Sequence, residues 1–381
     1  MKLIARTFAG LENLLEKELK TIGAQKLTIR KRAIEFEGDQ EMMYKVNLYS
    51  RFAIDVLTPI RKFEATTPEA LYDEVQKVNW SKYLNPEKTF SIKGIIYSSH
   101  FTHSQFAQLK AKDAIVDQIR DKTGDRPDVD TFKPDLGIVL RISEHKCELL
   151  LNSSGAPLFK RGYRRSTGKA PLNEILAAAC VEMSGWDMKT PFLDPMCGSG
   201  TIAIEAAMKA RNIAPGLVRE SFGFELWDDF DPKLWAKLKS IAEKQIKDSR
   251  VIIKGFDQDV DMVKTAKYNL RNIPSLMNTV HFEKQDFFTS ERPYAKAMLV
   301  FNPPYNKRIQ VMDAESFYDK IGTHLKHNFQ NCEALVLSSN LFAIKRIGLK
   351  PKKRYTLYNG PDETKLVHFE MYQGTKKPQN A

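Results

Sequence analysis

The stretch FLDPMCGSGTIAIEAA, Phe192 to Ala207, decides which fold this chain of 381 residues adopts. It begins as a short apolar strand and ends as an amphipathic helix, with Gly198, Ser199 and Gly200 between them. Glycines allow a tight turn and the close approach of a ligand, while the helix N-terminus presents free N–H groups. The stretch therefore predicts a ligand-binding turn at the carboxyl edge of a sheet.

The residue types in this turn narrow the choice of ligand. The phosphate-binding pattern GxxxxGK[ST] and the dinucleotide pattern GxGxxG are not matched. Asp194, at the end of the strand, would repel a pyrophosphate but suits a positively charged ligand. S-adenosylmethionine carries an ammonium and a sulfonium group, so we expect it here. A strand-to-helix turn without a ligand is the alternative.

The sequence after residue 190 alternates short apolar strands with amphipathic helices, a pattern typical of a parallel, doubly wound α/β sheet. The segments RYTLYNG and TKLVHFEMY predict a terminal β-hairpin. Residues 213–250 are longer than one strand-helix-strand unit requires and are expected to be an insertion with its own helix at 232–246. The expected strands are 191–195, 251–256, 279–283, 297–302 and 334–338, and the expected helices are 201–210, 260–270 and 315–325.

Two further acids follow the next two strands of this sheet. Asp257, in GFDQD, is expected at the ribose of the cofactor, with Asp259 as the N-cap of the following helix. Asp286, in EKQDFF, is expected to face the adenine amine. Acids at strand ends often only cap helices, so each of these residues is weak evidence alone. Acids at three successive strand ends together favour a cofactor site.

The fourth strand ends in NPPY, Asn302 to Tyr305. The exocyclic amine of a nucleobase is a poor nucleophile because its lone pair is delocalised into the ring. The side-chain oxygen of Asn302 and the carbonyl of Pro303 could accept both N–H bonds and free the lone pair. The prolines fix the backbone, and Tyr305 offers a face for stacking the base. A plain strand-terminating turn is the alternative, and the motif does not distinguish guanine from adenine.

The N-terminal part reads as two α+β regions, which a segment rich in Gly, Pro and Ser links to the sheet. Five basic residues and no acid lie between Lys160 and Lys169. Lys345 to Arg354 is a second basic run, equally consistent with a solvated surface and with phosphate contacts. The net charge of +12 modestly favours a polyanionic partner.

Together DPMCGSGT, NPPY and KRGYRRSTGKAPLNE resemble the bacterial THUMP-domain methyltransferases. That family includes the ribosomal RNA large-subunit guanine-N2 methyltransferase and many proteins labelled N6-adenine-specific DNA methylases. The resemblance implies a class I S-adenosylmethionine-dependent methyltransferase preceded by a ferredoxin-like and an RNA-binding THUMP domain. A second methyltransferase domain, fused in some relatives, is expected to be absent. The implied domains are ferredoxin-like at 1–64, THUMP at 65–155, linker and start of the catalytic domain at 156–190, and methyltransferase at 191–381.

The resemblance also implies site residues by position. Asn306, Lys307 and Arg308 stand where the family commonly has Gly-Glu-Arg, which adds positive charge beside the base. The implied catalytic residues are Asn302, Pro303, Pro304 and Tyr305, and the implied RNA-binding residues are Lys160, Arg161, Arg164, Arg165, Lys307 and Arg308. The implied cofactor-binding residues are Ala170, Pro171, Asn173, Glu174, Asp194, Met196, Cys197, Gly198, Gly200, Thr201, Asp257, Gln258, Asp286 and Phe287.

The expected function is transfer of a methyl group from S-adenosylmethionine to guanine N2 of 23S ribosomal RNA. A DNA adenine-N6 methyltransferase and a catalytically silent RNA-binding assembly factor are the alternatives. A thiouridine synthetase would need a loop such as SGGxDS, which the sequence lacks. The chain has no apolar run of 18 residues and no signal peptide, so a cytoplasmic location without membrane contact is expected. Its four scattered cysteines and its His pairs predict neither disulfides nor a metal site.

Overall fold

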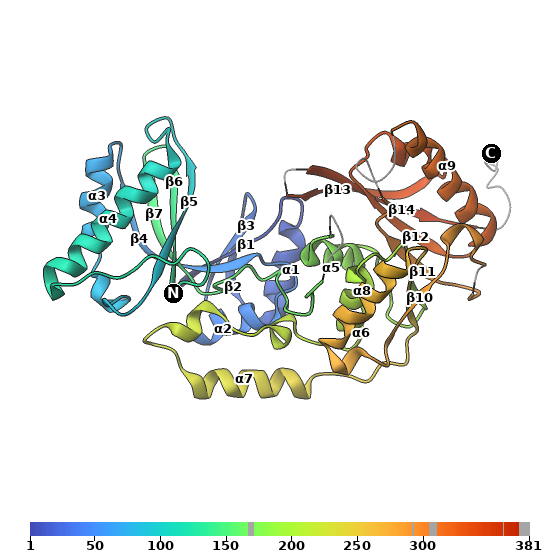
Figure 1. Cartoon of the computed structure of the whole chain (residues 1–381), viewed down its shortest axis with the longest axis horizontal. Coiled ribbons are helices and arrows are strands. Elements are labelled where there is room, and N and C mark those ends of the chain that lie inside the picture. Colours follow the sequence, from blue (N-terminus) through green and yellow to red (C-terminus); the bar gives the residue numbers. More distant parts are fainter. Residues whose placement is uncertain (167–170, 292, 305–310, 361, 373–381) are drawn as a thin grey trace. The chain divides into compact units, whose positions relative to one another are not determined.

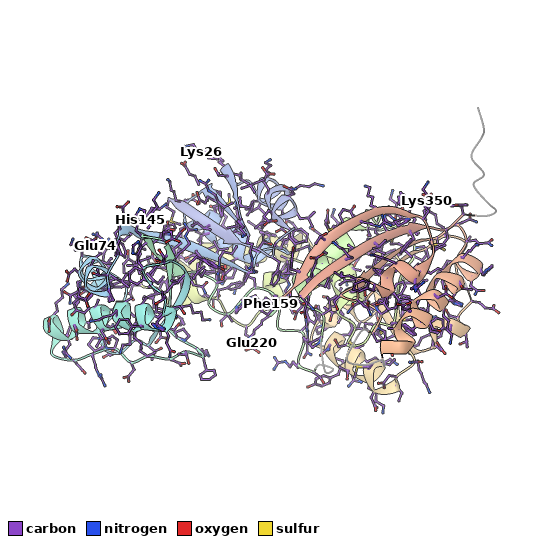
Figure 2. The ribbon with its side chains drawn as sticks, turned by 90° about the horizontal axis from the view of Figure 1, so that it is seen from above. Lys26, Glu74, His145, Phe159, Glu220 and Lys350 are labelled. Atoms are coloured by element: carbon purple, nitrogen blue, oxygen red, sulfur yellow. The ribbon has the colours of Figure 1, made fainter. Side chains whose placement is uncertain are left out.

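The computed structural model describes residues 1–166, 171–291, 293–304, 311–360 and 362–372 and divides the chain into two compact units (Figure 1). The chain passes between the units more than once, and Figure 2 labels Phe159 and Glu220, which lie at two of these crossings. Unit 1 comprises Met1–Thr7, Leu15–Leu158 and Arg219–Ile241, and unit 2 comprises Phe8–Leu14, Phe159–Val218 and Ala242–Ala381.

Unit 1 is built on a seven-stranded sheet with the strand order β2-β3-β1-β4-β7-β6-β5. Its strands pair antiparallel except for β5 and β6, which are parallel. The elements from the N-terminus to residue 152 are β1 (Lys2–Arg6), α1 (Glu12–Ile22), β2 (Gln25–Arg30), β3 (Ala33–Glu37), α2 (Gln40–Tyr49), β4 (Asp55–Glu64), α3 (Pro68–Gln76), η1 (Trp80–Lys82), β5 (Phe90–Tyr97), α4 (Ser104–Thr123), β6 (Leu136–Ser143) and β7 (Lys146–Asn152).

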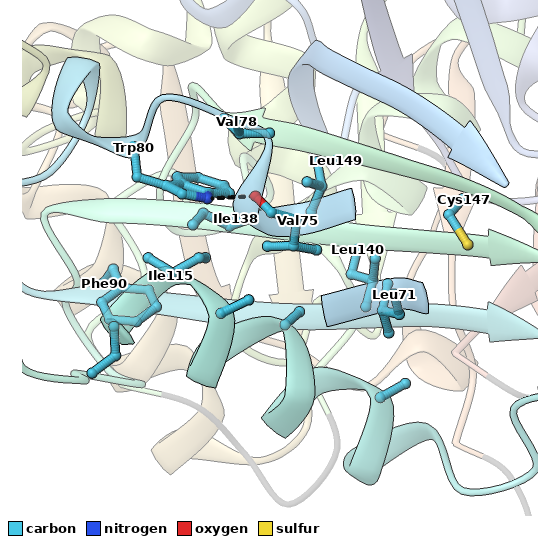
Figure 3. Packing of buried hydrophobic residues seen from close by; sticks show 14 of the residues in the cluster. Leu71, Val75, Val78, Trp80, Phe90, Ile115, Ile138, Leu140, Cys147 and Leu149 are labelled. Atoms are coloured by element: carbon cyan, nitrogen blue, oxygen red, sulfur yellow. Dashed lines mark hydrogen bonds between the residues drawn. The ribbon is translucent and has the colours of Figure 1, made fainter. Parts of the chain in front are cut away.

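The core under α3 and α4 is apolar and contains a tryptophan whose indole N–H is paired. Trp80, Phe90 and Leu140 are fully buried there (Figure 3). The Trp80 indole Nε1 donates a 2.9 Å hydrogen bond to the Val75 carbonyl, so the large ring is buried without an unpaired donor. These side chains pack α3 and α4 against β5, β6 and β7.

Unit 2 is built on a second seven-stranded sheet with the order β10-β9-β8-β11-β12-β14-β13. The first five strands in this order run parallel. Strand β14 pairs antiparallel with β12, and β13 pairs antiparallel with β14. This arrangement confirms the predicted doubly wound sheet with a terminal hairpin. Its elements are α5 (Glu174–Met183), β8 (Phe192–Pro195), α6 (Thr201–Ala210), η2 (Pro215–Val218), β9 (Ile253–Asp257), α8 (Val260–Arg271), η4 (Pro274–Leu276), β10 (Val280–Lys284), η5 (Phe287–Thr289), β11 (Met298–Phe301), α9 (Val311–Asn328), β12 (Glu333–Ser338), η6 (Ala343–Ile347), β13 (Pro351–Asn359) and β14 (Asp362–Glu370).

The order of the strands determines where a ligand can bind in unit 2. Strand β8, the middle one of the five parallel strands, has β9 on one side and β11 on the other. The chain therefore continues from β8 through β9 to β10 on one side and then returns to β11 and β12 on the other side. In such sheets, ligands bind outside the carboxyl ends of the strands at this reversal. Asp194, Asp257 and Asn302 therefore all belong to one edge of the sheet.

Helix α5 was not among the predicted elements. Each residue from Glu174 to Val181 is buried, because this helix packs against α6 and is covered on all sides. A helix that is apolar all round lacks the 3.6-residue periodicity by which surface helices are recognised.

The predicted insertion at 213–250 contains η3 (Gly223–Leu226) and α7 (Pro232–Lys244). Its residues 219–241 are part of unit 1, where the rings of Phe224 and Tyr44 stack with centroids 4.3 Å apart. Arg219 donates to the carbonyls of Pro157 and Ala156 at 2.9 and 3.0 Å. Unit 2 is therefore not the continuous block 191–381, and the other domain boundaries stay a prediction. Among the described residues, no helix is both long and apolar enough to cross a membrane.

Candidate active site

The glycine turn between β8 and α6 needs glycine at two positions for different reasons. Gly200, with φ +83°, would place a Cβ 2.6 Å from the ring of Phe282 and 3.0 Å from Cβ of Ala266. Gly198, with φ +51°, would place its Cβ in open space. Of these two glycines, Gly198 lines the two cavities described below and Gly200 does not. The structure thus places Gly198 beside the ligand space, whereas Gly200 is the N-cap of α6 and serves its packing.

Asp194 is 1% exposed, and among the described residues neither of its carboxylate oxygens has a hydrogen-bond partner. Burial raises its pKa well above the usual value, and the charge of Asp257 adds to the rise. The Ala203 amide opposes the rise without reaching hydrogen-bonding geometry. Asp194 lines a small cavity of 50 Å³ together with Pro171, Met196, Cys197, Thr201 and Asn302. A buried, unpaired carboxylate beside a cavity fits a cationic ligand group.

A larger cavity of 500 Å³ follows the carboxyl ends of β9, β10 and β11. Met196, Gly198, Met262 and Asn302 line both cavities, so the two are neighbouring parts of one site. Of the remaining residues that the sequence predicted, the larger cavity brings together Asp257, Gln258, Asp286, Phe287 and Pro304.

Asp257 connects the glycine turn after β8 to the start of α8 at the wall of the larger cavity. Its Oδ2 accepts a hydrogen bond from the Gly198 amide at 2.9 Å and its Oδ1 accepts one from the Asp259 amide at 3.0 Å. Asp259 in turn accepts from the Asp261 amide at 2.8 Å and caps α8, as predicted. These hydrogen bonds therefore fix the carboxylate of Asp257 beside Gly198.

Asp286 begins the short helix η5, where its Oδ1 accepts a 2.9 Å hydrogen bond from the Phe288 amide. The next residue, Phe287, is buried against the rings of Phe301 and His324, with centroids 5.6 and 4.7 Å away. This packing fixes the η5 backbone at the cavity wall.

Asn302 directly follows β11. Its Oδ1 is buried and has no hydrogen-bond partner among the described residues, although the residue lines both cavities. A buried amide oxygen without a donor is costly, which favours a ligand donor in the functional complex. Pro304 lines the larger cavity and Pro303 is buried. Tyr305, Lys307, Arg308 and Ala170 lie outside the described residues.

Some residues that line the larger cavity were not predicted. Met262 lies in the first turn of α8, and Phe317 and Lys320 lie one turn apart on α9. The spacing of 317 and 320 marks one helix face, and α8 begins directly after β9, so strand ends combined with helix faces could have indicated them. Gln285, Phe288 and Ser316 complete this set.

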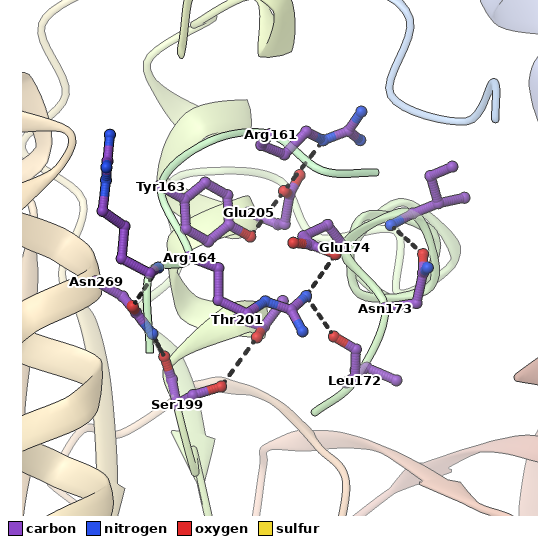
Figure 4. A network of polar contacts seen from close by, with 12 residues as sticks. Arg161, Tyr163, Arg164, Leu172, Asn173, Glu174, Ser199, Thr201, Glu205 and Asn269 are labelled. Carbon is purple, nitrogen blue, oxygen red and sulfur yellow. Dashed lines mark hydrogen bonds and ion pairs between the residues drawn. The ribbon is translucent and has the colours of Figure 1, made fainter. Parts of the chain in front are cut away.

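The segment KRGYRR, residues 160–165, was interpreted as an RNA contact, and for Arg161 and Arg164 this interpretation is wrong (Figure 4). Arg161 is 1% exposed and its Nε lies 3.5 Å from Glu205 Oε1, which also accepts from the Tyr163 hydroxyl at 3.1 Å. Arg164 pairs with Glu174 at 2.5 Å and donates to the Leu172 carbonyl at 2.7 Å. Both arginines compensate buried carboxylates, so neither side chain is available to a phosphate.

The same network contains two predicted cofactor residues, Asn173 and Glu174, which are not among the described residues that line the two cavities. Asn173 caps α5 by accepting from the Ile175 amide at 2.9 Å. Burial raises the pKa of Glu174 to about 7, although Arg164 counteracts this. Asn173 and Glu174 thus stabilise the start of α5, and their contact with the cofactor stays a prediction. Lys160 and Arg165 are exposed, and their contact with RNA stays a prediction.

The second basic run does not lie wholly beside the site. In register, Pro351 lies opposite Phe369 and Glu370 lies opposite Glu333, at the amino end of β12. Lys352 pairs there with Glu333 at 3.0 Å and Glu370 at 3.7 Å. Figure 2 labels Lys350, just before β13. The part of the run in β13 therefore lies at the edge opposite the cavities, so proximity to the site does not support a phosphate contact there.

Two negative features complete the site. Burial and the nearby Asp194 raise the pKa of the Cys197 thiol well above its usual value, which argues against a nucleophilic cysteine. Among the described residues, no group of three or more His, Cys, Asp or Glu side chains could hold a metal ion.

Comparison with known proteins gives a consistent picture. Family models match over residues 161–368 (RMKL-like, methyltransferase domain), 65–152 (THUMP domain) and 2–57 (RlmL ferredoxin-like domain). A Synechocystis sp. protein named as a candidate RNA methyltransferase is 38% identical over 365 residues, which are 95% of this chain and 95% of that protein.

Longer relatives and a solved structure agree with these matches. The ribosomal RNA large subunit methyltransferase K/L of Aliivibrio salmonicida is 36% identical over 94% of this chain, but the match covers only 52% of that protein. The chain thus spans about half the length of the K/L relatives. The solved structure of SMU.472, named as a candidate methyltransferase and bound to S-adenosylhomocysteine, has a TM-score of 0.86 and 29% identity, and the match covers 98% of this chain and 99% of that chain.

Proposed function

The chain belongs to the RMKL-like methyltransferase family, and from this premise we propose that it methylates the 2-amino group of a guanine in large-subunit ribosomal RNA. It is an S-adenosylmethionine-dependent methyltransferase. The observation that carries the proposed chemistry is the buried amide oxygen of Asn302 beside the cofactor cavity, which has no hydrogen-bond partner among the described residues.

The residues at the sheet edge fit this cofactor. The buried Asp194 carboxylate suits the ammonium group, and Asp257 lies at the next strand end, where the ribose hydroxyls are expected. Asp286 and the packed Phe287 form the wall expected to face the adenine ring. When bound, the cofactor supplies an electrophilic methyl group. The chain itself binds and orients the two reactants.

Asn302 and Pro303 would act on the substrate amine. An acceptor at Asn302 Oδ1 and a second at the Pro303 carbonyl would hold the two N–H bonds, so that the nitrogen lone pair points at the methyl carbon. Orientation and electrostatics of this kind can supply most of the rate enhancement without a strong general base. The amine loses its proton readily after it becomes cationic.

The substrate is proposed from the relatives. The K/L relatives are named for ribosomal RNA of the large subunit, and the chain matches about half of their length. The THUMP match over residues 65–152 supports RNA over DNA. The preference for guanine over adenine rests on the family resemblance alone, because the amide clamp would hold either amine. A DNA adenine-N6 methyltransferase is therefore the second candidate.

Nucleoside mass spectrometry of a strain that lacks the protein tests the proposal. We expect a partial loss of N2-methylguanosine from 23S rRNA, restored by the wild-type gene and not by an Asn302→Ala gene expressed at the same level. Unchanged N2-methylguanosine together with lost N6-methyladenine in DNA would replace the RNA assignment by the second candidate.

A further inference from the structure

Unit 1 contains a cavity of 460 Å³, almost as large as the 500 Å³ cavity beside the cofactor turn. It lies where β4, β6 and β7 of the sheet meet α2, η1 and residues 227–229 of the inserted segment. Pockets of this volume are typical of small-molecule or single-residue ligands. No residue of this cavity takes part in the proposed methyl transfer.

The walls of the cavity are apolar and partly aromatic. Tyr83 of the η1 region and Trp227 of the insertion both line it. Trp227 Nε1 is buried and has no acceptor among the described residues. Flat apolar walls with a spare N–H donor suit a planar heterocycle that carries acceptor atoms. Met43, Ile60, Leu136 and Leu151 form the rest of the apolar lining.

The rim of the cavity carries charges of both signs. Asp228 is paired with Lys88 at 2.5 Å, so its charge is neutralised. Asp229 also lines the cavity; its backbone carbonyl is fixed by Gln40 Nε2 at 2.6 Å, and no ion pair to its carboxylate is found in the described part of the chain. Burial, with a smaller contribution from the charge of Asp229, raises the pKa of Tyr83, and both residues line the cavity. Lys82 is exposed at the same rim.

We propose that this cavity binds one unpaired nucleobase that carries an exocyclic amine. The base would stack against the aromatic walls and donate its amine to Asp229, while Lys82 contacts the adjoining phosphate. A fatty or purely apolar ligand would leave the buried indole N–H of Trp227 without an acceptor. The RNA origin of the base rests on the proposed function. The same chemistry in a free nucleotide is the other source, and the experiment separates the two.

The test measures binding of the single-stranded hexamers rA6, rC6 and rU6, and of AMP, CMP and UMP, to the full chain by calorimetry. Saturating S-adenosylhomocysteine keeps nucleosides out of the cofactor cavity. We expect rA6 and rC6 to bind more tightly than rU6, and the mononucleotides to bind more weakly than the hexamers. Equal binding of all three hexamers, or no binding, would overturn the proposal. Mononucleotides that bind as tightly as hexamers would overturn the RNA origin.

Three variants locate the binding. Asp229→Asn removes an acceptor charge and should reduce rC6 affinity about tenfold while leaving rU6 unchanged. Thr58→Phe fills the cavity, lined by Thr58 on β4, and should abolish the preference. Lys82→Glu should weaken all hexamers, whereas Lys93→Glu is the matched control, because Lys93 is exposed on β5 of the same unit and does not line the cavity.

The variants also guard against misleading results. Unchanged melting temperature and unchanged S-adenosylhomocysteine binding show that each variant is folded. Equal losses for Lys82→Glu and Lys93→Glu, or full rC6 selectivity in Thr58→Phe, contradict the assigned site. Intact rRNA methylation without base selectivity would defeat this inference alone, and base selectivity without rRNA methylation would defeat the proposed function alone.

Discussion

At the scale of single residues, the site is marked by polar atoms that the fold itself leaves unsatisfied. Within the part of the chain that the structure describes, Asp194 and Asn302 both have buried oxygens without hydrogen-bond partners, whereas Asp257 and Asp286 each accept hydrogen bonds from the backbone. Native proteins rarely retain buried unsatisfied groups without a reason. A ligand that brings a cation to Asp194 and a donor to Asn302 would satisfy both groups.

Cofactor binding should depend on pH through Asp194. Burial raises its pKa, so part of the free protein carries a neutral Asp194, and a cationic ligand favours the charged form. Binding therefore releases a proton, and affinity for S-adenosylmethionine should increase with pH until the pKa of Asp194 in the free protein is passed. Calorimetry in buffers of different ionisation enthalpy measures the proton release. Asp194→Asn should bind more weakly and lose the pH dependence; a wild-type affinity that does not change with pH contradicts this role.

Asn302→Ala should separate chemistry from cofactor binding. Loss of one preorganised acceptor is expected to lower kcat about 100-fold or more, because the amine is no longer oriented. The dissociation constant for S-adenosylhomocysteine should change by less than about threefold, since the change removes no charge. Single-turnover kinetics and calorimetry measure the two effects. Asn302→Asp, of nearly the same size, retains an acceptor; turnover close to wild type in Asn302→Ala would remove the proposed clamp.

At the scale of elements, buried ion pairs connect the segment KRGYRR, residues 160–165, to α5 and α6. Arg161→Ala leaves Glu205, which is 1% exposed, without its cation and should cost about 3–5 kcal/mol of unfolding free energy. Lys160→Ala, at the exposed neighbouring position, should change it by less than about 0.5 kcal/mol. Urea denaturation monitored by fluorescence compares them. Similar stabilities for both variants would mean that Arg161 does not compensate Glu205.

The glycine turn allows a second comparison at this scale. Gly200→Ala should destabilise unit 2 by more than Gly185→Ala. Both positions have positive φ, which costs alanine about 1 kcal/mol. Only the Gly200 Cβ would meet atoms within 4 Å, 2.6 Å from the Phe282 ring, whereas the Gly185 Cβ meets none. Thermal unfolding of the two variants isolates the steric effect at Gly200. Equal shifts in Tm would show that Ala266 of α8 and Phe282 of β10 can move aside at no cost in stability.

The sequence predicted some of these elements and missed others for physical reasons. Strand ends followed by acids or NPPY are local patterns, so the cofactor edge could be predicted. Arg161 and Arg164 look like surface cations because their partners Glu205 and Glu174 are distant in sequence or lie beyond the basic run. Helix α5 lacks a polar face. Only the tertiary structure reveals that these arginines are buried.

At the scale of the whole molecule, the predicted classes of both halves agree with the two sheets, but the path of the chain between them was not predicted. The sequence marks residues 213–250 as an insertion and does not show where it packs. In the structure, Phe224 stacks on Tyr44 of α2, 180 positions earlier in the chain, so residues 219–241 complete unit 1. Long-range aromatic packing of this kind leaves no local pattern.

The inserted segment contributes to a cavity of unit 1 as well as to its packing. It supplies Trp227 and Asp229 to the cavity of unit 1, while unit 2 holds the cofactor edge. We therefore infer a division of labour in which one unit binds RNA bases and the other performs the transfer.

The most direct test uses purified protein, methyl-labelled S-adenosylmethionine and 23S rRNA from the strain that lacks the protein, followed by digestion to nucleosides and mass spectrometry. The wild-type chain should place the label in N2-methylguanosine, and the Asn302→Ala chain should leave that nucleoside unlabelled. Label in N6-methyladenosine, or label transferred to duplex DNA in place of rRNA, would contradict the account.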